Sequence, residues 1–277
     1  MVDKPEGPTS HDVVARARRL FRTRAVGHTG TLDPFATGLL ILVFGGATRL
    51  ARWAQRHRKT YRADVRLGVV TDTDDRTGRV TQERHPESWP DREQVEAALR
   101  ELAGVQSQRP PAFSAKRIEG ERSHRVARRG GAPVPAPVEV TVFSIELLDY
   151  APPMLSFRAE VSPGTYIRAL GRDLGERLGI GAHVAELRRE KIGPWRVDQA
   201  RPLAGLDGSE PLLPPRSLVD DLAAVSLDAE EIIAVGHGRT IRRDGVSEGE
   251  AALLDGQRLV AVARAAPGGW HPVVVLA

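Results

Sequence analysis

Residues Gly27–Leu40 read GHTGTLDPFATGLL and carry the densest functional signal in the 277-residue chain. The stretch combines glycines, hydroxyl groups, a histidine and one carboxylate, Asp33, which is the only acid between Asp12 and Asp64. An Asp-Pro pair commonly starts a turn, and a lone histidine such as His28 is commonly a hydrogen-bonded structural group. The residue types alone therefore leave both a structural and a catalytic interpretation open.

The segments around this stretch predict a helix, a buried element and a strand. Residues 9–12 have the form of a capping box, and apolar residues at helical spacing follow them, so residues 10–21 predict a basic amphipathic helix. Residues 36–44, ATGLLILVF, form a short apolar run that suits a buried element. Residues 60–70 alternate strictly, with Tyr61 on the apolar face, which predicts a half-buried strand.

The rest of the chain alternates between regular elements and long connections. The spacing of apolar residues predicts helices over residues 91–102 and 167–178, and a hairpin of two strands over residues 138–150 and 154–162. Between them, residues 105–137 are rich in proline and basic residues, which is typical of a mobile arm rather than core. Residues 202–215 read as a linker, and short strands with turns are expected beyond residue 223.

Charge is distributed unevenly along the chain, although the formal net charge is only +4. Residues 11–60 contain ten Lys or Arg against two acids, and residues 104–131 contain seven against two. Residues 205–260 contain eleven acids and five arginines. A bias toward arginine codons explains the excess of arginine over lysine but not this clustering, so we expect a basic face that suits phosphates and an acidic far end.

Composition and missing motifs exclude several classes of protein. Without cysteine there is no disulfide, no thiolate metal site and no cysteine nucleophile. There is no apolar run of about 18 residues and no secretory signal at the start, so we expect a soluble cytoplasmic protein. The chain contains no GxxxxGK[ST], GxGxxG or HxxxH motif, which argues against nucleotide-dependent and metal-dependent hydrolases. The acids at 72, 74 and 75 resemble half a calcium loop.

Five further motifs accompany Gly27–Leu40 along the chain. They are KPEGPTS (Lys4–Ser10), KTYRADVRLGVVTDTDDRTG (Lys59–Gly78), PPAFSAKRIEGER (Pro110–Arg122), GTYIRALGRDLGE (Gly164–Glu176) and HVAELRR (His183–Arg189). Together the six motifs closely resemble, in order, those of the bacterial tRNA pseudouridine-55 synthases, the TruB family. The resemblance spans about residues 3–222.

The resemblance implies an α+β fold, the pseudouridine synthase fold, with a mixed, largely antiparallel central sheet, flanking helices and a catalytic cleft across the sheet. It implies a catalytic domain over residues 1–222, with a basic RNA-binding arm at about 105–137. Residues 223–277 would form a small β-rich, PUA-like C-terminal domain. Because this tail is acidic, a role in stability or partner contact is an equal alternative to RNA binding.

The implied activity is isomerisation of uridine 55 in the T loop of tRNA to pseudouridine. Detaching uracil, turning it and rejoining it through carbon consumes no electrons, water or group donor, so no cofactor and no metal are expected. The target base must be flipped out of a folded RNA. The expected partner is tRNA alone, bound by a monomer with no membrane and no obligate protein partner.

The resemblance also assigns roles to individual residues. Asp33 is the expected catalytic aspartate. Arg168 would pair with it, because desolvation in a closed pocket disfavours a lone carboxylate, although an exposed helix charge is the structural alternative. Tyr61 would stack on the target base, or simply belong to the core. Tyr166 of the GTYIR motif would also contact the substrate, and Leu187 would help to wall the pocket.

Four residues are expected to contact RNA outside the uracil pocket. By resemblance, His28 takes the stacking position that the flipped base vacates. Lys4, Arg117 and Arg122 would hold phosphates, a role that their charge suits without specifying it.

Two rival functions share the motifs. One is a catalytically silent tRNA-binding chaperone, since fold does not fix function. The presence of Asp33, Tyr61 and Arg168 argues against it. The other is a guide-RNA-dependent pseudouridine synthase, against which the basic arm over residues 104–131 favours a stand-alone enzyme.

Overall fold

The computed structural model describes residues 1–113, 117–118, 121–122, 136–246 and 248–276. Contacts divide the chain into two compact units, neither of them continuous in sequence. Unit 1 comprises Met1–Thr9, Leu32–Leu39 and His57–Ala200, and unit 2 comprises Ser10–Thr31, Leu40–Arg56 and Arg201–Ala277. The domain boundary expected after residue 222 stays a prediction.

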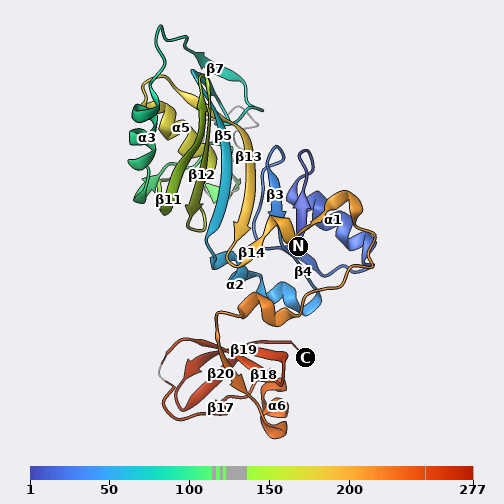
Figure 1. Ribbon diagram of the computed structural model, residues 1–277. Helices are drawn as coiled ribbons and strands as arrows, with labels where there is room; N and C mark the ends of the chain where they lie inside the picture. Colours follow the sequence, from blue (N-terminus) through green and yellow to red (C-terminus); the bar gives the residue numbers. More distant parts are fainter. Residues whose placement is uncertain (114–116, 119–120, 123–135, 247, 277) are drawn as a thin grey trace. The chain divides into compact units, whose positions relative to one another are not determined.

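Unit 1 is built on a mixed sheet in the order β1-β3-β13-β5-β12-β11-β8 (Figure 1). Its strands are β1 Val2–Lys4, β3 Thr37–Leu40, β5 Lys59–Leu67, β8 Gly104–Gln108, β11 Val138–Ala151, β12 Met154–Val161 and β13 Ala182–Ile192, with β14 Trp195–Arg196 paired to β13. The β3–β13 pair is parallel, whereas β13–β5, β5–β12, β12–β11 and β11–β8 are antiparallel. The expected mixed, largely antiparallel sheet with helices is thus confirmed.

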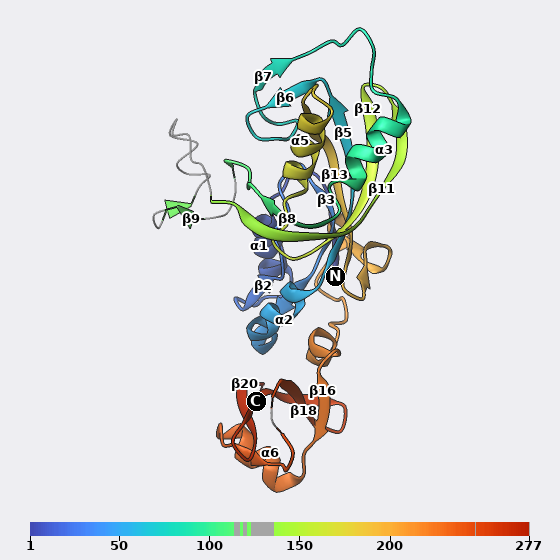
Figure 2. The same cartoon turned by 90° about the vertical axis from the view of Figure 1, so that its left-hand side faces the viewer.

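Two helices, α3 Arg92–Arg100 and α5 Ile167–Arg177, cover one face of this sheet (Figure 2). Their apolar residues join those of β5, β11, β12 and β13 in one buried cluster. The alternation predicted for residues 60–70 is observed, since Tyr61, Ala63 and Val65 are buried there. Asp91 caps α3 by accepting a bond from the Gln94 amide, which fixes where the helix begins.

Residues 104–108 correct the predicted extent of the basic arm. They form β8, an edge strand whose residues pair with Val138–Val142 of β11. Residues 105–108 were predicted to belong to the arm because an edge strand that is mostly exposed shows little alternation of apolar residues. Two short hairpins also belong to unit 1: β6 Val69–Thr71 with β7 Val80–Glu83, and β9 Arg117–Ile118 with β10 Glu121–Arg122.

Gly38 is required where β3 meets β13. Its φ is +104°, and a Cβ there would overlap the carbonyl oxygen of Arg189. We expect Gly38→Ala to lower the free energy of unfolding by about 2 kcal/mol or more, because backbone strain and overlap add. Gly104→Ala is the matched control, since its φ is +94° but no atom lies within 4 Å of the added Cβ. Denaturant unfolding of both variants tests this, and equal losses would contradict it.

Unit 2 contains the basic helix and the tail. The helix predicted over residues 10–21 is α1 Ser10–Leu20, and the apolar run divides between β3 and β4 Leu42–Phe44, which pairs with β2 Val26–His28. The short helices η1 Gly45–Leu50 and α2 Ala51–Arg56 follow. Within this unit, the Trp53 indole donates to Glu250 over 2.9 Å, and Arg56 pairs with the same carboxylate.

The tail forms a five-stranded sheet in the order β16-β18-β19-β20-β17. Its strands are β16 Ala223–Ser226, β17 Ile241–Arg242, β18 Glu250–Asp255, β19 Arg258–Ala266 and β20 Gly269–Val275. The β-rich character expected beyond residue 223 is confirmed. The structure adds a helix that was not predicted, α6 Ala229–Gly236, capped by Asp228 and Glu231. The helices of the described residues include none long and apolar enough to cross a bilayer.

Candidate active site

Asp33 and Arg168 form an ion pair that joins the loop before β3 to the first turn of α5. The Arg168 Nε lies 2.9 Å from Asp33 Oδ2, and Nη2 donates to Asp33 Oδ1 over 3.2 Å. A planar guanidinium holds a carboxylate most specifically through two such bonds. The Asp33 side chain is 36% exposed and that of Arg168 only 5%, so the carboxylate is accessible while its cation is buried.

Arg168 contacts oxygens of three other residues besides Asp33. Nη1 donates to the carbonyl of Thr73 over 2.8 Å and lies 3.3 Å from Asp75 Oδ2. Nη2 also donates to the carbonyl of Phe113 over 3.0 Å. The guanidinium thus makes three hydrogen bonds, to Asp33, Thr73 and Phe113, and two further ion-pair contacts, to Asp33 and Asp75. Lysine, with three donors on one nitrogen, cannot reproduce this arrangement.

Asp75 is a site residue that the sequence did not single out. It is buried, and its Oδ1 accepts from Thr73 Oγ1, from the Thr77 amide and from Thr77 Oγ1 at 2.9, 2.9 and 2.6 Å. These bonds leave Oδ2 directed at Arg168. The threonines flanking the carboxylate were the available signal, but they indicated only a turn.

Tyr61 and Leu187 lie in the same buried cluster as the residues that precede Asp33 and Arg168 in the sequence. Leu32 precedes Asp33 and Ile167 precedes Arg168, and both pack in the cluster that contains Tyr61 and Leu187. The inward orientation expected for Tyr61 is confirmed, since the residue is 9% exposed on the apolar face of β5. The structure therefore gathers an accessible carboxylate, a buried arginine, a tyrosine ring and a leucine on the helix-covered face of the sheet.

The ammonium group of Lys4 is bound by backbone carbonyls. It is fully buried, and its ammonium donates to the carbonyls of Pro5, Pro8 and Pro34 at 2.8, 2.9 and 3.3 Å. Burial lowers the pKa of Lys4 to about 8, and the nearby Asp33 opposes that shift. These bonds attach Lys4 to the loop that contains Pro34, next to Asp33, and the expected phosphate contact of Lys4 stays a prediction.

The other predicted residues lie outside this cluster or outside the described side chains. Tyr166 is the residue that precedes α5, and its backbone is hydrogen-bonded to Gln108. His28 lies in β2 of unit 2, where its Nδ1 accepts from the Gly30 amide over 3.3 Å. Arg117 and Arg122 face each other in the β9–β10 hairpin, and their side chains lie outside the described atoms.

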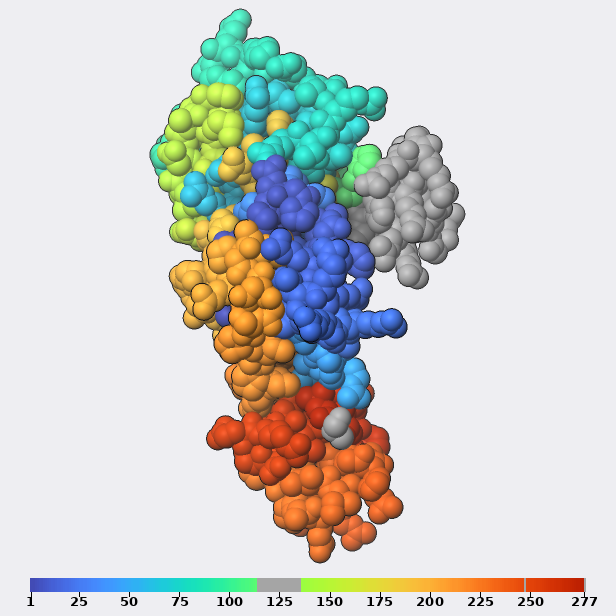
Figure 3. All heavy atoms as spheres, turned by 90° about the vertical axis from the view of Figure 1, so that its right-hand side faces the viewer, coloured from blue at the N-terminus to red at the C-terminus, as the bar shows by residue number. Residues whose placement is uncertain are grey.

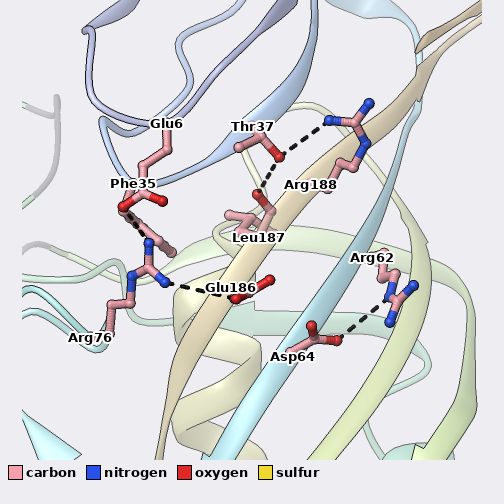
Figure 4. Close-up of a pocket in the computed structure, with 9 residues that line it drawn as sticks. All are labelled: Glu6, Phe35, Thr37, Arg62, Asp64, Arg76, Glu186, Leu187 and Arg188. Carbon is pink, nitrogen blue, oxygen red and sulfur yellow. Dashed lines mark hydrogen bonds and ion pairs between the residues drawn. The ribbon is translucent and has the colours of Figure 1, made fainter. Parts of the chain in front are cut away.

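A cavity of about 250 Å³ includes Phe35 and Leu187 of the buried cluster in its lining (Figure 4). Its lining residues are Glu6, Phe35, Thr37, Arg62, Asp64, Arg76, Glu186, Leu187 and Arg188. Arg76 forms an ion pair with Glu6. In Figure 3 the N-terminal residues, coloured dark blue, lie against the segment of the chain that contains Arg76. Asp33, Tyr61 and Arg168 are not among the lining residues, whereas Leu187 is.

The described part of the chain contains no group of three or more histidine, aspartate or glutamate side chains arranged to hold a metal ion.

Comparison with known proteins identifies the family. Residues 18–167 match the model of the TruB family pseudouridylate synthase N-terminal domain, and residues 168–207 match that of the tRNA pseudouridylate synthase B C-terminal domain. The chain belongs to the TruB family. The tRNA pseudouridine synthases B of Solibacter usitatus and Thermobifida fusca are 40% and 42% identical to it over 289 residues, and each alignment covers 100% of this chain and 98% or 97% of the relative.

Solved structures support the same fold. An H/ACA RNP bound to a substrate RNA containing 2'-deoxyuridine aligns with a TM-score of 0.75 at 24% identity, covering 100% of this chain and 84% of that one. A Cbf5-Nop10-Gar1 complex aligns with a TM-score of 0.71 at 28% identity, covering 95% and 76%. The matched residues 18–167 include Asp33, the carboxylate of the ion pair described above.

Proposed function

We propose that this TruB family member isomerises uridine 55 in the T loop of tRNA to pseudouridine, with Asp33 as the catalytic group. The observation that carries the proposal is the bidentate pairing of an accessible Asp33 with a buried Arg168. Support for the substrate comes from relatives about 40% identical over the whole chain that are named tRNA pseudouridine synthase B.

Asp33 acts as nucleophile or base on the flipped nucleotide, either at the uracil ring or at the ribose. Closing RNA over the site removes water from the carboxylate, which favours its neutral form. Arg168 opposes that effect from the protein side, and Asp75 holds Arg168 in place through the bonds described above. The site thus keeps an ionised carboxylate ready without a metal or a cofactor.

The base is held by apolar and aromatic contacts. Tyr61 stacks on uracil and Leu187 walls the pocket, while Tyr166 contacts the substrate from the start of α5. His28 fills the position that the flipped base leaves, offsetting part of an unstacking cost of a few kcal/mol. Arg117 and Arg122 in the basic arm contact phosphates of the T arm. The tail from residue 223 acts as a PUA-like domain, for which its five-stranded sheet and small size are the support.

The enzyme acts as a monomer in the cytoplasm, where its tRNA substrate is found, without an obligate protein partner. The fold is shared with proteins that assemble into H/ACA complexes, but identity is higher with the bacterial tRNA enzymes.

Cofactor independence is the first test. Protein treated with chelator and then desalted, given no nucleotide, should release one tritium per tRNA transcript labelled at uracil C5, because the reaction is an isomerisation. A transcript with cytidine at position 55 should release none. A requirement for an added metal beyond that needed to fold the RNA, or for a cofactor, would contradict the proposal.

A further inference from the structure

The side chain of Gln108 forms two hydrogen bonds with the residue that precedes α5. Its Nε2 donates to the carbonyl of Tyr166 over 3.1 Å, and its Oε1 accepts from the Tyr166 amide over 2.8 Å. Gln108 ends the edge strand β8, 58 residues away in sequence, and is 1% exposed. A buried amide with both bonds made is held in one orientation, since losing either would leave a polar group unsatisfied.

These two bonds fix the start of α5 from outside the helix. The first amides of a helix have no partner within it, and Tyr166 makes no capping bond with its own side chain. Gln108 supplies the missing acceptor for the Tyr166 amide. The Tyr166 carbonyl also accepts from the Leu170 amide, so Gln108 binds a group that belongs to the first turn.

The residues that follow Gln108 in the sequence accept hydrogen bonds from two arginines of α5. Arg172 Nη2 donates to the carbonyl of Arg109 over 2.9 Å, and Arg168 Nη2 donates to the carbonyl of Phe113 over 3.0 Å. Arg172 also donates a hydrogen bond to Asp74. Burial raises the pKa of the Asp74 carboxyl, and the positive charge of Arg172 opposes that shift. These hydrogen bonds attach residues 108–113 to the first two turns of α5. The side chain of Arg168 extends from this part of the helix to Asp33.

We propose that Gln108 is a positioning residue for the Arg168–Asp33 pair. It touches neither group, and it acts by setting where the first turn of α5 lies, which determines whether the Arg168 fork reaches both oxygens of Asp33. The proposal rests on the proposed function, because it assumes that this pair carries the reaction. An amide is suited to the task because it donates and accepts at once, which methionine of similar length cannot do.

Gln108→Met should lower the single-turnover rate about 10- to 100-fold, the range in which a shift of about 1 Å affects catalysis, with tRNA affinity within twofold of the parent. Gln106→Met is the matched control: it lies on the same strand and donates to the carbonyl of Leu102 rather than to α5. Its rate should stay within twofold of the parent.

A second variant keeps the test decisive if Gln108→Met does not fold. Gln108→Glu retains the acceptor for the Tyr166 amide, but as a carboxylate it cannot donate to the Tyr166 carbonyl. Burial and that carbonyl both favour the protonated acid, which donates and accepts as the amide does. Its rate relative to the parent should therefore rise as the pH falls from 8 to 6. A ratio that falls as the pH falls would overturn the proposal, since the protonated acid restores both bonds to Tyr166.

A double-mutant cycle separates positioning from general destabilisation. If Gln108 acts through Arg168, Gln108→Met should cost less than about threefold in an Arg168→Lys background, because the fork it positions is already absent. The inference would be overturned, and the proposed function left intact, by either of two results. One is a rate loss in the double variant equal to the product of the losses of the two single variants. The other is a parental rate for Gln108→Met. A parental rate for Arg168→Lys alone would overturn the catalytic pair and the inference together.

Discussion

Asp33→Asn should abolish pseudouridine formation, by at least about 10⁴-fold, while leaving tRNA affinity close to normal. The amide has the shape of the carboxylate and still offers an oxygen to Arg168, whose other contacts to Thr73, Asp75 and Phe113 are unchanged. It neither ionises nor serves as base or nucleophile. Binding depends instead on many arginine contacts to phosphates, and removing one anion cannot weaken that attraction.

Tritium release and filter binding on the same preparation separate these two quantities. Asp64→Asn is a matched control, since Asp64 alternates along β5 with the buried Tyr61 and Ala63 and makes no bond to Arg168 among the described contacts. That control should keep its rate within about twofold, because Asp64 contacts Ser156 and Arg62 rather than the Arg168 guanidinium. Normal release from Asp33→Asn would remove Asp33 from catalysis, whereas a collapse of binding would show that the substitution disrupts the fold.

Arg168→Lys should lower the single-turnover rate about 10²-fold or more, and Arg168→Ala should lower it further. Lysine keeps a positive charge but loses the fork that reaches Asp33, Asp75, Thr73 and Phe113 together. Alanine also leaves the buried Asp75 without its cation, and breaking a buried pair costs about 3–5 kcal/mol of stability. Arg168→Ala should therefore melt at a lower temperature than Arg168→Lys.

Rates at a temperature where all variants are folded, together with thermal melts, test this ranking. Arg177→Lys serves as the control because Arg177 ends the same helix and pairs with the exposed Glu101 over 3.5 Å. Parental rates for both Arg168 variants would show that the arginine acts only as a structural charge.

Local patterns predicted most of the framework of unit 1. The alternation around Tyr61 gave the strand and its buried face, and the spacing before Gly179 gave α5, because half-buried elements repeat their apolar residues with the period of the element. The edge strand β8 was missed because only one side of it is paired. Helix α6 was missed because Val235 is its single fully buried residue, which left the Asp228–Glu231 capping box as the usable signal.

The site was predictable only where a residue type matched its role. Asp33 and Arg168 were expected to pair, and they do. The burial of Lys4 was not predicted, because lysine is almost never fully buried without partners, and here the carbonyls of Pro5, Pro8 and Pro34 supply those partners. Asp75 and Gln108 depend on contacts with residues about 58 to 93 positions away, at Tyr166 and Arg168, and no local pattern encodes such contacts.

The most direct test of the central claim is nucleotide-resolution mapping of pseudouridine in an unmodified tRNA transcript before and after incubation with the pure protein. We predict that a single new pseudouridine appears, at position 55 in the T loop, and that none appears with the Asp33→Asn variant. No pseudouridine with the parent protein, or pseudouridine only at other positions, would contradict the account.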